Sequence, residues 1–147
     1  MPNNQAEEIF IKGLQAYTNG HEYLALVCFE NAVDLEKSPL YCSYLAFCLA
    51  KVRGHYCKAI NICEEALEKE SFNAVHYVNL GRIYLLSNQR EKALTTLRQG
   101  LQYQRKDEVR RELERLGMRG KPIFPFLQRG NPLNKYCGLL LKKLGYR

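Results

Sequence analysis

The sequence lacks the features of a membrane protein, a secreted protein or a low-complexity chain. No apolar run approaches the roughly 20 residues that a helix needs to cross a bilayer. The first eight residues are polar and acidic, without the basic and then apolar pattern of a signal peptide. Only 5 prolines and 10 glycines occur, and 46% of the residues are hydrophobic. These absences favour a folded, cytoplasmic protein.

The sequence also has none of the common patterns of catalytic or metal-binding chemistry. It contains 6 cysteines, but no two of them have the two-residue gap of a zinc knuckle or a redox dithiol. Most lie within apolar helical patterns, where a reduced thiol packs as a small hydrophobe. The 3 histidines have no nucleophile or metal ligand at a diagnostic spacing, and no glycine-rich phosphate loop is present. We therefore predict that the protein is not an enzyme, has no cofactor and binds no metal.

Positive charge is concentrated in the last third of the chain. Residues 1–97 carry 9 Lys and Arg against 11 Asp and Glu, a net charge of −2. Residues 98–147 carry 13 Lys and Arg against 4 Asp and Glu, a net charge of +9. Such an asymmetry indicates a possible interaction with acidic partners.

Small and apolar residues recur at an interval of 34 residues. Three sets share this interval: Ala25, Ala59 and Ala93; Phe29, Cys63 and Leu97; and the loop residues Gly20, Gly54 and Asn88. Within each unit the apolar residues follow the spacing of an amphipathic α-helix, and a second apolar stretch precedes the loop. The repeat therefore predicts three units, each made of a helix, a short turn and a helix.

These units resemble the tetratricopeptide repeat family. The third unit has the fullest match, at Tyr77, Leu80, Gly81, Tyr84, Ala93, Leu97 and Gly100, where the last replaces the usual alanine. The first unit matches at Ile9, Gly13, Ala25, Phe29 and Ala32. The second matches at Ala59, Cys63 and Ala66, but either Ala46 or Phe47 stands where its small residue belongs, so the register there is open by one residue.

The resemblance implies an all-α fold, a right-handed α-solenoid of three units that cover residues 6–39, 40–73 and 74–107 within a repeat domain of residues 1–107. We expect a charged capping helix at residues 108–118. A basic tail with prolines and glycines then follows at 119–147 and ends in an amphipathic helix at about residues 132–144. The segment from Pro125 to Asn134 is similar to a tail seen in some bacterial repeat proteins, so we expect a bacterial source.

The resemblance also implies a concave face, lined by the first helix of each unit, that binds a protein or a peptide. The residues transferred to that face are Phe10, Leu14, Tyr17, Tyr41, Tyr44, Lys51, Asn79, Arg82 and Leu86. Some of them could instead contact neighbouring helices. Chaperone adaptors of the family clamp a terminal carboxylate with basic and asparagine residues. Phe10 and Leu14 occupy the equivalent positions of the first unit, so we expect that clamp to be absent.

The basic tail leaves three alternatives open. Its apolar residues could dock onto the repeats or onto another subunit, giving a homo-oligomer; the candidates are Phe124, Phe126, Leu127, Tyr136 and Leu140. Its last helix could instead lie on an anionic membrane surface. The third alternative is contact with nucleic acid or another acidic surface through residues 98–147, with Arg110, Arg111, Arg115 and Arg119 as the basic surface. We favour docking to protein and disfavour the membrane and nucleic acid.

The sequence as a whole predicts a non-catalytic scaffold or adaptor that binds a protein or peptide segment. Binding of nucleic acid or an acidic surface through the basic C-terminal region is the alternative. Neither the identity of the partner nor the oligomeric state follows from the residues, because helical repeats of this kind serve many unrelated assemblies.

Overall fold

The part of the chain described by the computed structural model, residues 4–103 and 106–115, is entirely helical apart from short connections. Seven helices follow one another in this part: α1 (Asn4–Thr18), α2 (Glu22–Leu35), α3 (Pro39–Arg53), α4 (Tyr56–Lys69), α5 (Ala74–Leu86), α6 (Arg90–Gly100) and α7 (Lys106–Arg115). None of these helices is long and apolar enough to cross a membrane.

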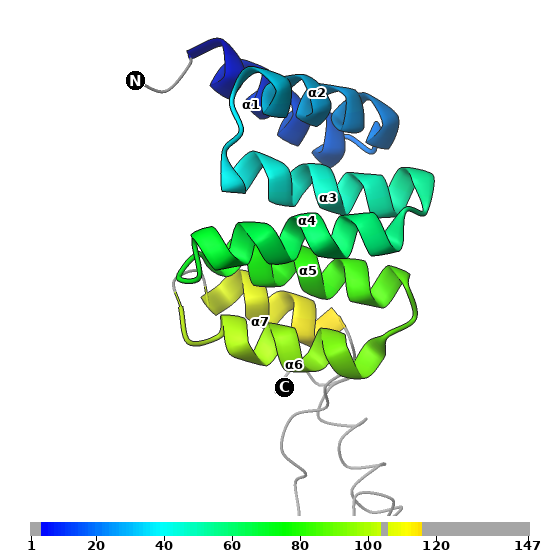
Figure 1. Cartoon of the computed structure of the whole chain (residues 1–147). Helices are drawn as coiled ribbons and strands as arrows, with labels where there is room; N and C mark the ends of the chain where they lie inside the picture. Colours follow the sequence, from blue (N-terminus) through cyan, green and yellow to red (C-terminus); the bar gives the residue numbers. More distant parts are fainter. Residues whose placement is uncertain (1–3, 104–105, 116–147) are drawn as a thin grey trace, which may run out of the picture. The chain divides into compact units, whose positions relative to one another are not determined.

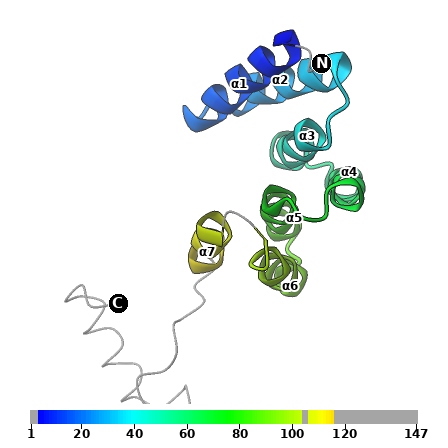
Figure 2. The same ribbon diagram turned by 90° about the vertical axis from the view of Figure 1, so that its left-hand side faces the viewer.

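The first six helices form three antiparallel pairs that are stacked in chain order (Figure 1). The pairs are α1 with α2, α3 with α4, and α5 with α6, and the contacts between α2 and α3, between α3 and α5 and between α4 and α5 join them. In Figure 2, where α3 to α6 are seen end-on and α1 and α2 lie obliquely, successive pairs follow one another. A single pair cannot bury its apolar surface, so this stacking creates one continuous core. The predicted all-α helical-repeat solenoid is confirmed.

The turns within the three pairs are built in the same way. Gly20, Gly54 and Asn88, each 34 residues from the next, have positive φ angles of 81°, 67° and 61°. Glycine adopts this left-handed conformation without steric cost, and asparagine tolerates it better than most residues. The turn residues of the repeat therefore match the backbone that each tight helix-to-helix connection requires.

Glycines mark the places where the two helices of a pair approach each other most closely. A Cβ atom on Gly13 of α1 would lie 2.6 Å from the ring of Phe29 on α2. A Cβ atom on Gly81 of α5 would lie 2.8 Å from Cγ of Leu97 on α6. Real Cβ atoms do not approach other heavy atoms so closely. The large residue of the second helix therefore fills the space that the glycine leaves.

The second pair reaches the same packing with its first helix shifted by one residue. In the first and third pairs the turn amides of His21 and Gln89 donate to the carbonyls of Ala16 and Tyr84, which lie five residues earlier. In the second pair the amide of His55 donates to the carbonyl of Leu49, six residues earlier. The close-approach glycines lie three residues before the acceptors, and the residue three before Leu49 is Ala46.

Ala46 is therefore the small residue of the second pair, and it is fully buried. An exact interval of 34 residues from Gly13 would place Phe47 opposite α4. Because of the shift, Phe47 contacts other residues. Its ring meets the ring of Tyr17 on α1, with 5.5 Å between centroids. The register that the sequence left open is thus decided by the turn.

Helix α7 packs on the last pair through a narrow apolar face. Val109 is fully buried and Leu113 is 6% exposed. A Cβ atom on Gly100 of α6 would lie 2.7 Å from Cβ of Tyr77 and 3.4 Å from Cγ2 of Val109. An alanine, usual in the family at this position, would therefore collide with Tyr77. The predicted tail at 119–147 and its terminal helix lie outside the described residues.

Candidate functional site

Three of the residues expected on the concave face are buried in contacts between helices. Phe10 is 6% exposed, and its ring stacks on that of Tyr41 with 4.5 Å between centroids. Tyr41 is itself 8% exposed, and Asn79 is fully buried. Phe10 and Tyr41 thus hold α1 against α3, which is a packing role in the protein without a partner.

Two further residues of that set, Leu14 and Tyr44, are partly buried at the edge of the same core. The ring of Tyr44 meets Phe10 edge-on at 5.3 Å and also lies 5.6 Å from Phe29. Leu86, at the end of α5, is 39% exposed. Of these three residues, Leu86 is the most exposed.

The remaining three residues, Tyr17, Lys51 and Arg82, meet around the ring of Phe47. We call these four residues the aromatic–cation cluster. Lys51 Nζ lies 5.2 Å from the ring centroid of Tyr17 and 5.9 Å from that of Phe47. The guanidinium carbon of Arg82 lies 5.5 Å from the centroid of Phe47. One cluster thus joins α1, α3 and α5, and cation–π contacts of this kind contribute about 0.5–1 kcal/mol each at exposed sites.

Each cation of the cluster has a glutamate partner from another helix. Lys51 Nζ lies 2.7 Å from Glu22 Oε1 of α2, and this hydrogen bond raises the pKa of Lys51. Arg82 donates from Nε to Glu112 Oε1 of α7 at 3.0 Å and from a terminal nitrogen to the same oxygen. Glu112 is only 6% exposed. The two glutamates thus hold the cationic groups beside the aromatic rings.

Changing Glu112 to glutamine is expected to loosen α7 on the last helix pair. Glutamine keeps the shape of the side chain but removes the charge that Arg82 pairs with. Charge-assisted hydrogen bonds are roughly twice as strong as neutral ones, so amide hydrogen exchange in α7 should become up to about tenfold faster. Glu114→Gln, an exposed change on the same helix, is the matched control. Equal exchange rates in the two variants would show that the Arg82 contact does not hold α7.

The predicted basic surface is partly described. Arg110, Arg111 and Arg115 on α7 are exposed, and Arg111 Nε donates to the carbonyl of Asp107 at 3.3 Å. Arg119 lies outside the described residues. So do the predicted tail contacts: Phe124, Phe126, Leu127, Tyr136 and Leu140.

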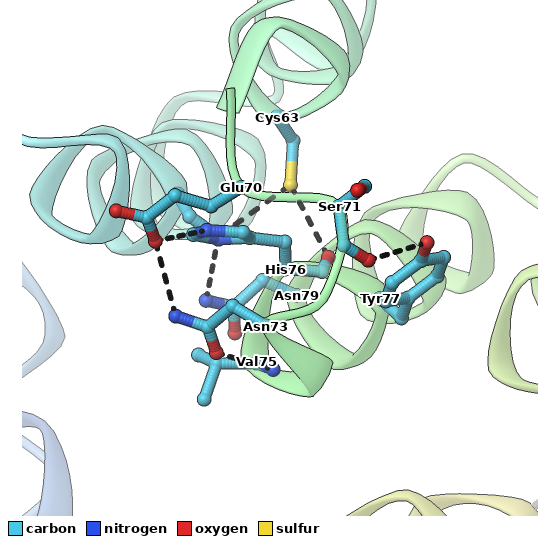
Figure 3. Close-up of polar contacts among 9 residues, drawn as sticks. Cys63, Glu70, Ser71, Asn73, Val75, His76, Tyr77 and Asn79 are labelled. Atoms are coloured by element: carbon cyan, nitrogen blue, oxygen red, sulfur yellow. Dashed lines mark hydrogen bonds and ion pairs between the residues drawn. The ribbon is translucent and has the colours of Figure 1, made fainter. Parts of the chain in front are cut away.

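A buried polar network lies between the second and third pairs (Figure 3). Asn79 Nδ2 on α5 donates to Ser43 Oγ on α3 at 3.0 Å, and Ser43 Oγ lies 3.6 Å from Cys63 Sγ on α4. Cys63 also donates to the carbonyl of His76 at 3.5 Å. A network of this kind fixes which side chains face one another, because each polar group needs a specific partner.

His76 extends the network to the connection between α4 and α5. Its ring is fully buried, and Nε2 lies 3.2 Å from Glu70 Oε2. Nε2 carries the proton and donates, because an ionised carboxylate can only accept. Nδ1 has no hydrogen-bond partner among the described residues. Burial lowers the pKa of His76 below its usual 6.5, against the opposing effect of Glu70.

Because the pKa of folded His76 is lowered, we expect the protein to lose stability in mild acid. Between pH 6.5 and the lower pKa of folded His76, the unfolded chain binds a proton that the folded chain does not. The free energy of unfolding should therefore fall as the pH falls through this window, by up to about 1.4 kcal/mol per pH unit from this group. Urea unfolding of the wild type and of His76→Gln at about pH 7.5 and pH 5.5 measures the difference.

The variant is expected to lose less stability on acidification than the wild type. The control is His55→Gln, since His55 is exposed in the turn before α4 and should retain the wild-type dependence on pH. Cys63 does not titrate in this range, because burial raises its pKa to about 12. If all three proteins lose the same amount of stability, His76 is not the group responsible.

The two buried thiols of the second pair lie in surroundings that favour their protonated form. Burial raises the pKa of Cys48 to about 12, as it does for Cys63, so both thiols stay protonated at neutral pH and are poor nucleophiles. Across residues 4–103 and 106–115, no group of three or more His, Cys, Asp or Glu residues could hold a metal ion.

Sequence reasoning missed three members of this site. Phe47, the ring at the centre of the cluster, was considered only as a candidate close-approach residue. The sequence does not single out Glu22, and it indicates Glu112 only as part of the charged face of the expected capping helix, because their cationic partners lie 29 and 30 residues away. The turn before His55 has one residue more than the turns of the other two pairs. This extra residue is the signal that would have indicated the position of Phe47.

Comparison with known proteins agrees with this architecture. Residues 53–116 match the family described as tetratricopeptide repeat. No curated protein is significantly similar in sequence. The first tetratricopeptide repeat domain of Spaghetti (RPAP3), solved bound to the HSP90 peptide SRMEEVD, is 17% identical, with a TM-score of 0.61 over 78% of this chain and 91% of that one.

Two further solved structures are similar in fold. The tetratricopeptide repeat domain of Arabidopsis OM64 is 18% identical, with a TM-score of 0.61 over 77% of this chain and 94% of that one. The Sgt2 domain from Aspergillus fumigatus is 15% identical, with a TM-score of 0.60 over 91% and 95%. Residues 53–116 thus match the tetratricopeptide repeat family in sequence, and the stacked helix pairs of the described residues have the fold of its solved repeat domains.

Proposed function

We propose that this protein is a non-catalytic scaffold that binds a protein or peptide segment on the face formed by α1, α3 and α5. The aromatic–cation cluster carries the proposal, because it joins all three helices and leaves its cationic groups partly exposed. The side chain of Lys51 is 32% exposed and that of Arg82 is 19% exposed. Partly buried aromatic and arginine side chains are the residue types that contribute most to binding energy at protein interfaces.

The chemistry of the cluster favours a segment with both apolar and acidic groups. Carboxylates of the partner can compete with Glu22 and Glu112 for Lys51 and Arg82, and apolar groups can cover the exposed parts of Tyr17 and Leu86. The peptide SRMEEVD, seen bound to the Spaghetti (RPAP3) domain, is a useful probe. We expect it to bind weakly, since Phe10 and Leu14 replace the carboxylate-clamp residues in the first unit.

The test is selection of peptides from a random displayed library on the full-length protein, followed by affinity measurement for the selected peptides. Tyr17→Ala and Lys51→Gln should each weaken binding by about tenfold. Tyr56→Ala, a change at an exposed aromatic residue on α4, should have no effect. Selected peptides that bind equally to all of these proteins would contradict the proposed face.

The alternative function, binding of nucleic acid through the basic C-terminal region, predicts a different dependence on salt. Its affinity would fall steeply as the salt concentration rises, because phosphate contacts release counterions. Neutralising Arg110, Arg111, Arg115 and Arg119 together would then abolish binding. For the proposed peptide face, these four changes should leave affinity unaltered.

A further inference from the structure

A second concave site lies on other residues of the same helices. It is a cavity of about 200 Å³ between the end of α2, the first half of α3 and the second half of α4. None of its lining residues belongs to the aromatic–cation cluster or to the face predicted from the sequence. Whatever binds here can therefore bind independently of the proposed peptide face.

The floor of this pocket is apolar, and its size matches a side chain. The floor is formed by Val33 from α2, Leu45 from α3, and Ile62 and Ala66 from α4. Sites for cofactors and drug-sized ligands usually enclose about 300–1,000 Å³. The smaller volume favours a single apolar anchor residue of a partner over a cofactor.

The rim of the pocket carries two lysines and one glutamate. Lys37 follows α2, and Lys69 ends α4 one turn after Glu65. Neither lysine forms an ion pair with another described residue. Burial raises the pKa of the partly buried thiol of Cys42, and both lysines lie close enough to lower it in part. The pocket thus carries two ammonium groups that form no ion pair with another described residue, and only one carboxylate.

We propose that this pocket binds an apolar side chain of a partner peptide whose flanking carboxylates pair with Lys37 and Lys69. Charge complementarity identifies the class of peptide, since each lysine gains the partner that it lacks. The same reasoning excludes the chain's own C-terminal segment. Residues 116–147 contain 7 Lys and Arg and no Asp or Glu. Their positive charges would be repelled by those of the two lysines.

The experiment uses the full-length protein and a fluorescent peptide of sequence DELFDE at low ionic strength. Saturable binding is expected, and Lys37→Gln combined with Lys69→Gln should weaken it by about tenfold. Glu65→Gln should strengthen it, because the change removes a like charge from the rim. Lys12→Gln combined with Lys58→Gln is the matched control, since these exposed lysines lie outside the pocket. It should leave the affinity unchanged.

Thiol labelling locates the bound peptide without a substitution. Saturating peptide should slow the reaction of Cys42 with N-ethylmaleimide, whereas Cys57, exposed on α4, should react at its usual rate. The peptides DESSDE and KKLFKK, which lack the anchor or reverse the charge, should not protect Cys42.

Three results would overturn the proposal. The first is no saturable binding of DELFDE, and the second is no protection of Cys42. The third is that Lys51→Gln weakens binding whereas Lys37→Gln combined with Lys69→Gln does not. The last would assign the acidic peptide to the aromatic–cation cluster. Failure at the pocket would leave the proposed function of that cluster intact, because the two sites share no residue.

Discussion

Replacing Phe29 with alanine is expected to lower the free energy of unfolding by about 3–5 kcal/mol. Phe29 is fully buried in α2, and its ring lies 5.5 Å from that of Phe10 and 5.6 Å from that of Tyr44. The ring of Phe29 fills the space beside Gly13. Its removal would create a cavity that the surrounding helices cannot fill without moving. Since domains are stable by about 5–15 kcal/mol in total, this loss is a large part of the whole.

Urea unfolding followed by circular dichroism measures this effect. Leu24→Ala, on the same helix but 53% exposed, should cost less than about 0.5 kcal/mol. A cost below about 1 kcal/mol for Phe29→Ala would mean that α2 is not held against α1 and α3 as the structure describes.

Leu97→Ala, the equivalent change in the third pair, is expected to cost about 2–5 kcal/mol. Its partner Gly81 makes the prediction sharper. In the wild type Gly81→Ala should be destabilising, because a Cβ atom 2.8 Å from Leu97 Cγ forces the helices apart at a cost of about 1–3 kcal/mol. In the Leu97→Ala background the Cβ atom that Gly81→Ala adds enters the space that the Leu97 side chain has left. Alanine also favours the helix by about 1 kcal/mol over glycine.

Gly81→Ala should therefore change sign, from destabilising in the wild type to stabilising in Leu97→Ala. Unfolding free energies of the four proteins in this double-mutant cycle test the contact directly. Additive effects, with the same sign in both backgrounds, would mean that α5 and α6 do not meet at this pair of residues.

The sequence predicted the fold class and the family because both depend on local spacing. Alanines and glycines at a 34-residue interval mark where helices can approach, and they recur whatever the rest of the chain does. The residues with positive φ at each turn follow the same interval. The limits of the repeats, the capping helix and the tail remain predictions.

The candidate site was less accessible to sequence reasoning. Residues transferred by position include Phe10 and Tyr41, which are buried against each other, and Arg82, which pairs with Glu112. Position within a repeat gives the direction of a side chain but not what lies opposite. The choice of these residues as a binding site stays a prediction.

The sequence by itself determined that the chain forms stacked helix pairs, because the size of a side chain at each recurring position limits how close two helices can come. Only the tertiary structure decided that Ala46 takes the close-approach position and Phe47 joins Tyr17, since one extra residue in a turn rotates a helix by about 100°. It also decided that Glu22 and Glu112 neutralise the cations of the cluster. Contacts between residues so far apart in the chain leave no periodic trace in the sequence.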